Sequence, residues 1–234
     1  MSLLKGEGKV LILFGTRSVV SGAITHEVYM ARPDLSGDWP TAVIFPSEWG
    51  ITSSMKELAR RLARQGLAVI VVDPYRGEPP ERAASLEEAE AVFATVPIDR
   101  VLRDGADVIR YIENPAGFWS TAEHGFAVIG IGSAGTAAAR TAAATGAALV
   151  LVSTTPDLTE VSGPILGLIG KADETIPESG VADARNAAPY SEWVLYEDVG
   201  RDLLDDYLEN FDQQVFDDAI ERIADFVETH LSFS

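Results

Sequence analysis

The residues best suited to chemistry gather around one glycine-rich segment, Gly130–Gly135 (G-I-G-S-A-G), which follows an apolar run and precedes an alanine-rich one. Three interpretations fit it. Its glycines match the G-x-G-x-x-G pattern that binds a dinucleotide pyrophosphate between a strand and a helix. It also fits a nucleophile elbow, a sharp strand-to-helix turn that presents one reactive side chain among small residues. The third interpretation is purely structural, with glycines that let a strand pack closely against a helix.

The surroundings of this segment bear on the choice. A dinucleotide site needs an acidic residue after the next strand to hold the ribose. Here the next apolar run, Ala148–Val152, leads into Ser153-Thr154-Thr155. The segment also lies in the middle of the chain, a position that a nucleophile elbow explains. The elbow and the structural turn remain open as alternatives.

Composition excludes several other chemistries. The 234 residues include 18 basic and 36 acidic ones, no cysteine and three histidines, and the formal net charge is −18. Such a charge disfavours binding to nucleic acid and to anionic membranes. Without cysteine there are no disulfides, thiolate metal sites or cysteine nucleophiles. No H-x-x-x-H or EF-hand pattern occurs, and the cluster Asp202, Asp205 and Asp206 is typical of charge in the first turn of a helix. We expect neither a metal nor a cofactor.

Location and domain organisation follow from similar observations. No apolar run is long enough to span a membrane, and the first residues lack the features of a signal peptide. The protein is therefore expected to be cytoplasmic. No linker divides the chain, so residues 1–234 are expected to form a single domain.

Apolar runs alternate with helical patterns along the chain, which predicts an α/β fold: a mostly parallel central sheet with helices on both faces and an antiparallel N-terminal lead-in. The expected strands are Lys9–Phe14, Ile24–Ala31, Thr41–Phe45, Leu67–Val72, Phe126–Ile131, Ala148–Val152, Ile165–Ile169 and Glu192–Tyr196. The expected helices are one capped by Thr52 or Ser53 and ended by Gly66, then Ser85–Ala94, Ile98–Glu113, Thr136–Thr145, and a C-terminal one with Phe211, Val215, Ala219, Ile223 and Phe226 on one side.

Several segments, in the right order over nearly the whole chain, resemble the dienelactone hydrolase family. They are Pro46–Gly50 (P-S-E-W-G), Ala59–Val69 (A-R-R-L-A-R-Q-G-L-A-V), Val72–Arg76 (V-D-P-Y-R), the turn at Gly130–Gly135, Gly170–Pro177 (G-K-A-D-E-T-I-P) and Tyr196–Leu203. The resemblance implies an α/β-hydrolase fold. It also implies hydrolysis of esters or lactones by a nucleophile, a histidine and an acid.

Two of the three triad positions implied by the resemblance hold residues that cannot do this chemistry. Gly132 stands at the nucleophile position and has no side chain, and Arg201 stands close to the histidine position. An arginine stays protonated and cannot act as a general base. Asp173 retains the acid. The three histidines lie elsewhere in the sequence, at His26, His124 and His230.

The resemblance also implies that part of a binding pocket remains. Glu48 matches the family's glutamate that contacts the resting nucleophile. The backbone N–H groups of Trp49 and Ser133 stand where the family stabilises an oxyanion. Tyr75 and Arg76 stand where it places polar groups that face the substrate.

The resulting hypothesis is a family member that lacks triad-based hydrolysis and binds a small molecule or a partner protein. In this reading the charged walls of the pocket are Glu48, Asp173, Arg76 and Arg201. The alternative for two of them is that Asp173 and Arg201 simply form an ion pair. Ser133 is expected to cap the following helix. The alternative is an active carboxylic-ester or lactone hydrolase with a rearranged site of Ser133, Glu48 and Asp173. A minor alternative is a dinucleotide-binding oxidoreductase.

Overall fold

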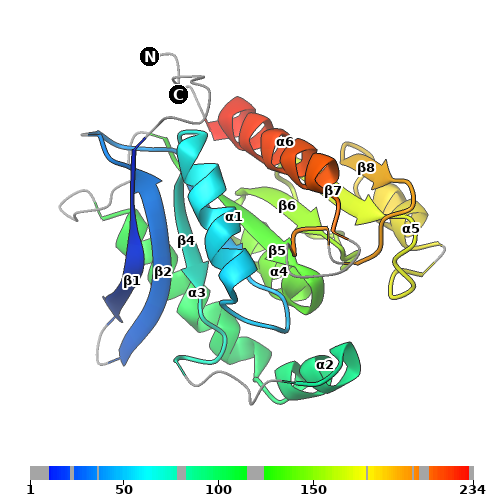
Figure 1. Cartoon of the computed structure of the whole chain (residues 1–234), viewed down its shortest axis with the longest axis horizontal. Coiled ribbons are helices and arrows are strands. Elements are labelled where there is room, and N and C mark those ends of the chain that lie inside the picture. The colour runs from blue at the N-terminus through cyan, green and yellow to red at the C-terminus, as the bar shows by residue number, and fades with distance from the viewer. Residues whose placement is uncertain are drawn as a thin grey trace.

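The computed structural model describes residues 11–21, 24–35, 37–77, 83–114, 124–177, 179–201, 203–205 and 211–231. Eight strands form one sheet in the order β1-β2-β4-β3-β5-β6-β7-β8 (Figure 1). The strands are β1 Ile12–Ser21, β2 Ile24–Pro33, β3 Thr41–Phe45, β4 Ala68–Val72, β5 Phe126–Ile131, β6 Ala148–Val152, β7 Ile165–Gly170 and β8 Glu192–Tyr196. The strands β1, β2 and β4 pair antiparallel, whereas the pairs from β4 through β8 are parallel. The predicted sheet and its antiparallel lead-in are confirmed.

Helices cover both faces of the sheet, because the parallel strands are apolar on both sides. The helices α1 (Ser53–Arg64) and α6 (Gln213–Leu231) pack on one face (Figure 1). On the other face lie α3 (Ile98–Ile112), α4 (Gly135–Thr145) and α5 (Gly180–Ala187). A further helix, α2 (Leu86–Ala94), is capped by Ser85 and buries Ala89. Every strand from β3 to β7 is buried along its full length, so the sheet forms a rigid base for the loops at its ends.

Three expectations about the elements need correction. The first strand was expected to end at Phe14, but residues from Gly15 to Ser21 continue β1 because they pair with β2; residues 9 and 10 lie outside the described part. The helix α5 was not predicted, since its short sequence has no regular apolar spacing. The last helix begins only at Gln213, so Asp205 lies before it and not in its first turn; Asp202 and Asp206 lie outside the described residues.

None of the helices in the described ranges combines the length and the apolar character that crossing a membrane requires.

Candidate functional site

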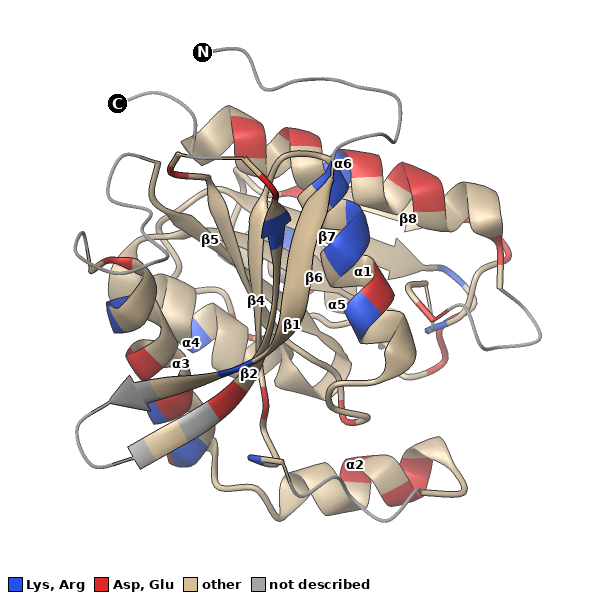
Figure 2. Cartoon of the chain, turned by 60° about the vertical axis from the view of Figure 1, so that its left-hand side comes forward, with Lys and Arg blue, Asp and Glu red and all other residues tan. Residues whose placement is uncertain are grey.

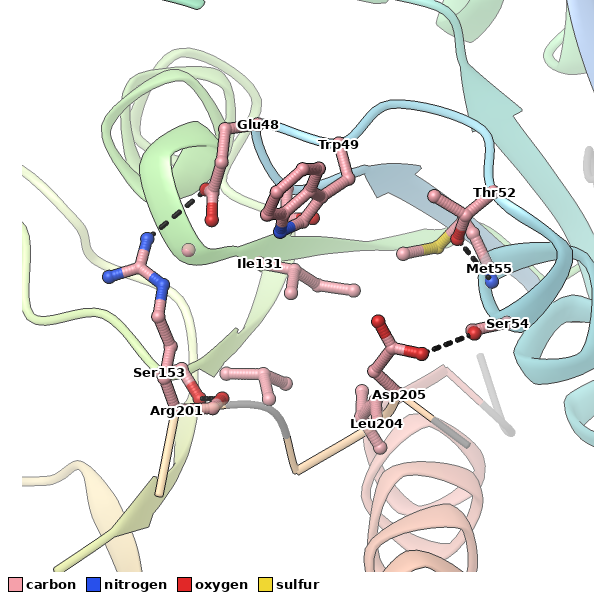
Figure 3. A pocket seen from close by; sticks show the side chains of 13 residues that line it. Glu48, Trp49, Thr52, Ser54, Met55, Ile131, Ser153, Arg201, Leu204 and Asp205 are labelled. Carbon is pink, nitrogen blue, oxygen red and sulfur yellow. Dashed lines mark hydrogen bonds and ion pairs between the residues drawn. The ribbon is translucent and has the colours of Figure 1, made fainter. Parts of the chain in front are cut away.

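The candidate site is built by loops that follow the carboxyl ends of parallel strands, the edge at which α/β proteins bind ligands. Glu48 follows β3, Gly132 follows β5, Asp173 follows β7 and Arg201 follows β8. The structure thus brings to one edge of the sheet the four positions that the resemblance in the sequence indicated. In Figure 3, Glu48 and Arg201 face each other across the start of the turn after β5.

The turn after β5 has the geometry of a nucleophile elbow without a nucleophile. Gly132 at its tip has φ +53°, in the left-handed region that strains other residues. The turn also brings strand and helix into close contact, because a Cβ on Gly130 would lie 2.4 Å from the Cβ of Ala138 in α4. The sharp turn expected of an elbow is therefore present, and the side chain that it would present is missing.

The space where a side chain at position 132 would begin is occupied by other residues. A Cβ built on Gly132 would lie 2.8 Å from Oε2 of Glu48 and 3.0 Å from Nη2 of Arg201. Both distances are shorter than ordinary contacts of a Cβ atom. Glu48 and Arg201 therefore lie against the position where the resemblance implies a nucleophile.

Glu48 is held by three contacts. Its Oε2 accepts a hydrogen bond from the backbone N–H of Ser133 and another from Nη2 of Arg201, each at 3.1 Å. Its backbone carbonyl accepts a hydrogen bond of 2.5 Å from the Tyr75 hydroxyl. Glu48 is 1% exposed, so its side-chain carboxyl group depends on the donors of Ser133 and Arg201 in place of water. One of the two N–H groups expected to stabilise an oxyanion is thus already bound to an internal anion.

The predicted ion pair between Asp173 and Arg201 is wrong, because Thr175 stands between them. The Thr175 hydroxyl donates to Oδ1 of Asp173 and accepts from Nη1 of Arg201, both at 2.6 Å. The other oxygen of Asp173, Oδ2, is buried and makes no hydrogen bond with any residue that the structure describes. A histidine at position 201, where the resemblance implies one, could donate a hydrogen bond to that oxygen.

Arg201 is bound on several sides. Besides Glu48, its Nη2 contacts Oε1 of Glu90 from α2 at 3.2 Å, and its backbone carbonyl accepts a hydrogen bond from the buried Ser153 hydroxyl. Sequence reasoning missed Thr175 and Glu90. The signal for Thr175 was its place two residues after Asp173, where an aspartate side chain commonly accepts from the backbone N–H, as it does here at 2.9 Å. Glu90 gave no signal, since its position depends on where α2 lies.

Two further expectations are corrected. Ser133 does not cap α4. It lies inside a short 3₁₀ turn, Gly132–Ala134, and α4 begins after Ala134 without a side-chain cap. Arg76 does not line the site. Its Nε and Nη2 bind the two carboxylate oxygens of Asp104 in α3, at 2.9 and 2.6 Å. Tyr75 lies behind Glu48 and supports it from the backbone side.

A small cavity of about 40 Å³ opens beside the elbow. Its walls are largely apolar, from Trp49, Ile131, Val152 and Leu204 among others, with Glu48 and Arg201 at one end. At the other end Ser54 donates a hydrogen bond of 2.6 Å to Asp205 (Figure 3). Pockets for drug-sized ligands measure roughly 300 Å³ or more. This cavity accordingly suits a ligand of only a few non-hydrogen atoms.

The pKa of Tyr75 is raised to about 12, mainly by burial and further by the negative charges of Glu48 and Asp73. Since the folded state holds this proton more tightly than the unfolded chain, whose tyrosine pKa is about 10, the contribution to stability is complete below about pH 10. It is lost as the pH rises from about 10 to about 12. Between about pH 10 and about pH 12, the free energy of unfolding of a Tyr75→Phe variant should therefore fall less than that of the wild type. Urea denaturation at several pH values measures this difference.

The control for this measurement is Tyr196→Phe. The pKa of Tyr196 is also raised, by burial and by its hydrogen bond to Asp218, away from Glu48. Each variant should therefore lose less free energy of unfolding at alkaline pH than the wild type does. An unchanged alkaline loss in Tyr75→Phe would contradict the raised pKa.

Comparisons with known proteins give a consistent result. The model of the dienelactone hydrolase family matches residues 26–231. An Escherichia coli (strain K12) protein provisionally named carboxymethylenebutenolidase is 26% identical in an alignment 242 residues long, gaps included. The alignment covers 92% of this chain and 86% of that protein. A Bradyrhizobium protein provisionally named 2-oxo-3-(5-oxofuran-2-ylidene)propanoate lactonase is 28% identical over 88 residues, only 38% of this chain and 36% of that protein. The crystal structure of a provisionally named dienelactone hydrolase from Klebsiella pneumoniae has a TM-score of 0.81 at 23% identity, covering 93% of this chain and 98% of the other.

Proposed function

Because the chain belongs to the dienelactone hydrolase family, we propose that it is a member without triad-based hydrolysis of esters or lactones, which uses the remaining pocket to bind a small molecule. Family membership favours the elbow interpretation of the turn at Gly132 over the dinucleotide interpretation. Hydrolysis through a triad needs a nucleophile and a base within hydrogen-bonding reach of each other. Gly132 provides no nucleophile and Arg201 provides no base.

The observation that carries the proposal is the filling of the nucleophile position. Oε2 of Glu48 and Nη2 of Arg201 lie 2.8 and 3.0 Å from the expected Cβ of a side chain at Gly132, so the ends of these two side chains would have to shift to make room for it. They also bind each other, at 3.1 Å, with Arg201 11% exposed in its side chain. An active triad hydrolase would carry its nucleophile at this position. Here a buried ion pair takes its place.

A second candidate is an active hydrolase that uses Ser133, Glu48 and Asp173. The names of the relatives, which describe hydrolases and lactonases, favour it. Against it, the carboxylate of Glu48 is engaged by Arg201 and by the backbone of Ser133. The Oδ1 of Asp173 is engaged by Thr175. Among the described residues, no hydrogen bond joins the Ser133 hydroxyl to either carboxylate.

The test is hydrolysis of p-nitrophenyl acetate by the purified wild-type protein beside a Ser133→Ala variant. Both are expected to release nitrophenol no faster than an equal mass of an unrelated acidic protein, because neither has a nucleophile paired with a base. Saturable turnover that disappears in Ser133→Ala would replace the proposal with the second candidate. Saturable turnover in both proteins would also overturn it and would indicate another nucleophile.

A further inference from the structure

A second cavity, of about 210 Å³, shares Trp49 with the cavity at the elbow. It lies where the hairpin of β1 and β2 meets α1 and the loops that follow β3 and β4. Its volume is well above the 40 Å³ at the elbow. It is still below the roughly 300 Å³ of pockets for drug-sized ligands. The second cavity therefore suits a small metabolite, of about the size of an amino acid.

The strand β2 and the helix α1 bring opposite charges to this cavity. Side chains two residues apart on a strand share a face, so Glu27 projects from the same face of β2 as Tyr29, which packs in the core beneath α1. On α1, Lys56 places its Nζ 5.9 Å from the centre of the Tyr29 ring. Both Glu27 and Lys56 line the cavity. A carboxylate and an ammonium thus enter it from neighbouring elements.

These two charged groups are not paired. Within the described residues, neither Glu27 nor Lys56 forms an ion pair or a side-chain hydrogen bond, with each other or with a third residue. Asp73, the other carboxylate at the cavity, is engaged: its Oδ1 and Oδ2 accept from the backbone N–H groups of Tyr75 and Gly77, at 2.9 and 2.6 Å. Asp73 therefore shapes the turn after β4, and Glu27 and Lys56 are the charged groups available to a ligand.

A ligand with both charges fits this arrangement best. A simple cation at Glu27 would face the positive charge of Lys56. A simple anion at Lys56 would face Glu27 and Asp73, in a protein whose net charge is −18. A zwitterion satisfies both groups and has no net charge of its own. Apolar surface from Ile51 and Trp49 can hold a short aliphatic side chain.

We propose that this cavity binds the zwitterion of a small aliphatic amino acid, with its carboxylate at Lys56 and its ammonium at Glu27. Each end of the ligand then makes a charge-assisted hydrogen bond. An α-amino acid carries both charged groups on one carbon, which leaves its side chain to pack against Ile51. The inference goes beyond the proposed function, because it concerns a cavity outside the elbow and holds whether or not the chain hydrolyses esters.

The experiment is isothermal titration calorimetry of the whole protein with three probes that share one carbon skeleton. L-Valine carries both charges, isobutylammonium chloride lacks the carboxylate, and sodium isovalerate lacks the ammonium. The buffer contains about 0.1 M sodium chloride, in which exposed charges more than about 10 Å apart are largely screened from each other. The wild type is compared with Lys56→Met and with Glu27→Gln, each of which removes one of the two charges.

Two control variants remove the same kinds of charge elsewhere. Lys171→Met removes an ammonium from the loop after β7, where Lys171 pairs with Glu197. Glu221→Gln removes a carboxylate from the acidic helix α6 (Figure 2). Neither Lys171 nor Glu221 is among the described residues that line the cavity. Thermal unfolding of each variant checks that it is folded.

L-Valine is expected to bind the wild type at least about tenfold more tightly than either singly charged probe, because only valine satisfies both groups. Lys56→Met and Glu27→Gln should each weaken its binding by about fivefold or more, an effect between that of an exposed ion pair and that of a charged hydrogen bond. The two control variants should change the affinity by less than about twofold, because distant surface charges are screened.

Three results would overturn the inference: no binding of L-valine to the wild type at tens of millimolar, binding of a singly charged probe as tight as that of L-valine, or equal losses in the cavity variants and the control variants. The titrations involve no turnover. Hydrolysis of p-nitrophenyl acetate would overturn the proposed function alone, so the two failures are distinguishable.

Discussion

A Gly132→Cys/Arg201→His double variant is expected to hydrolyse p-nitrophenyl acetate at least about a hundredfold faster than the wild type, the lower end of what a positioned base contributes. The cysteine restores a nucleophile at the tip of the elbow. The histidine restores a base beside Asp173, whose buried Oδ2 has no hydrogen-bond partner among the described residues. Removing the arginine also clears the guanidinium that lies 3.0 Å from the expected Cβ. The acetyl group would then have room beside Glu48.

The single variants are the controls for this gain. Gly132→Cys alone retains Arg201, so its new side chain meets both Arg201 and Glu48 and has no base. Arg201→His alone has a base but no nucleophile. Both should remain at the wild-type rate, with a burst of nitrophenol seen only in the double variant. Equal activity in Gly132→Cys and in the double variant would show that position 201 does not stand where the base is needed.

Replacing Arg201 by Met is expected to lower the free energy of unfolding by about 3 to 5 kcal/mol, the usual effect of removing one partner from a buried ion pair. The carboxylate of Glu48 is 1% exposed and would keep only the backbone N–H of Ser133 as a donor in the contacts described above. Urea denaturation measures the loss. The methionine keeps most of the volume of the arginine stem, so the lost charge is the main change.

The matched control is the Glu48→Gln/Arg201→Met double variant. Its glutamine carries no charge to be left without a partner, and it can still accept from Ser133. The double variant should therefore recover a large part of the stability lost in Arg201→Met. A double variant that is less stable than both Arg201→Met and Glu48→Gln would contradict this expectation. It would mean that the attraction within the ion pair exceeds the free-energy cost of removing its two charges from water.

The sequence could place the four candidate positions at one edge of the sheet because their location depends on the order of strands. Glu48, Gly132, Asp173 and Arg201 each follow a strand, and parallel strands bring their carboxyl ends to one edge of the sheet. Alternation of apolar and polar segments is a strong signal for that sheet. The first strand extends beyond the predicted end at Phe14, because Gly15 and Ser18, residue types common in connections, pair with β2.

The partners of Arg201 could not be predicted in the same way. Several carboxylates stand near the sheet edge, and the choice among Asp173, Glu48 and Glu90 depends on shifts of a few ångström in loops and in α2. The hydroxyl of Thr175 decides the matter at Asp173, since it takes the place that a guanidinium would otherwise fill. Sequence spacing carries no information at that scale. Asp205 was expected in the first turn of a helix as part of an acidic cluster. Its contact with Ser54 joins residues 151 positions apart, so the local sequence gives no signal of it.

The left-handed backbone of Gly132 has a consequence for how this protein can evolve. A non-glycine residue at φ +53° carries strain of roughly 1 to 2 kcal/mol, so the change to glycine would have released it. A return to cysteine alone would restore the strain and crowd Arg201 and Glu48. A return to histidine alone would take the guanidinium away from a buried carboxylate. On the proposed function, neither step is expected to yield activity by itself, so selection acting on one substitution at a time would favour neither, and the glycine would be retained.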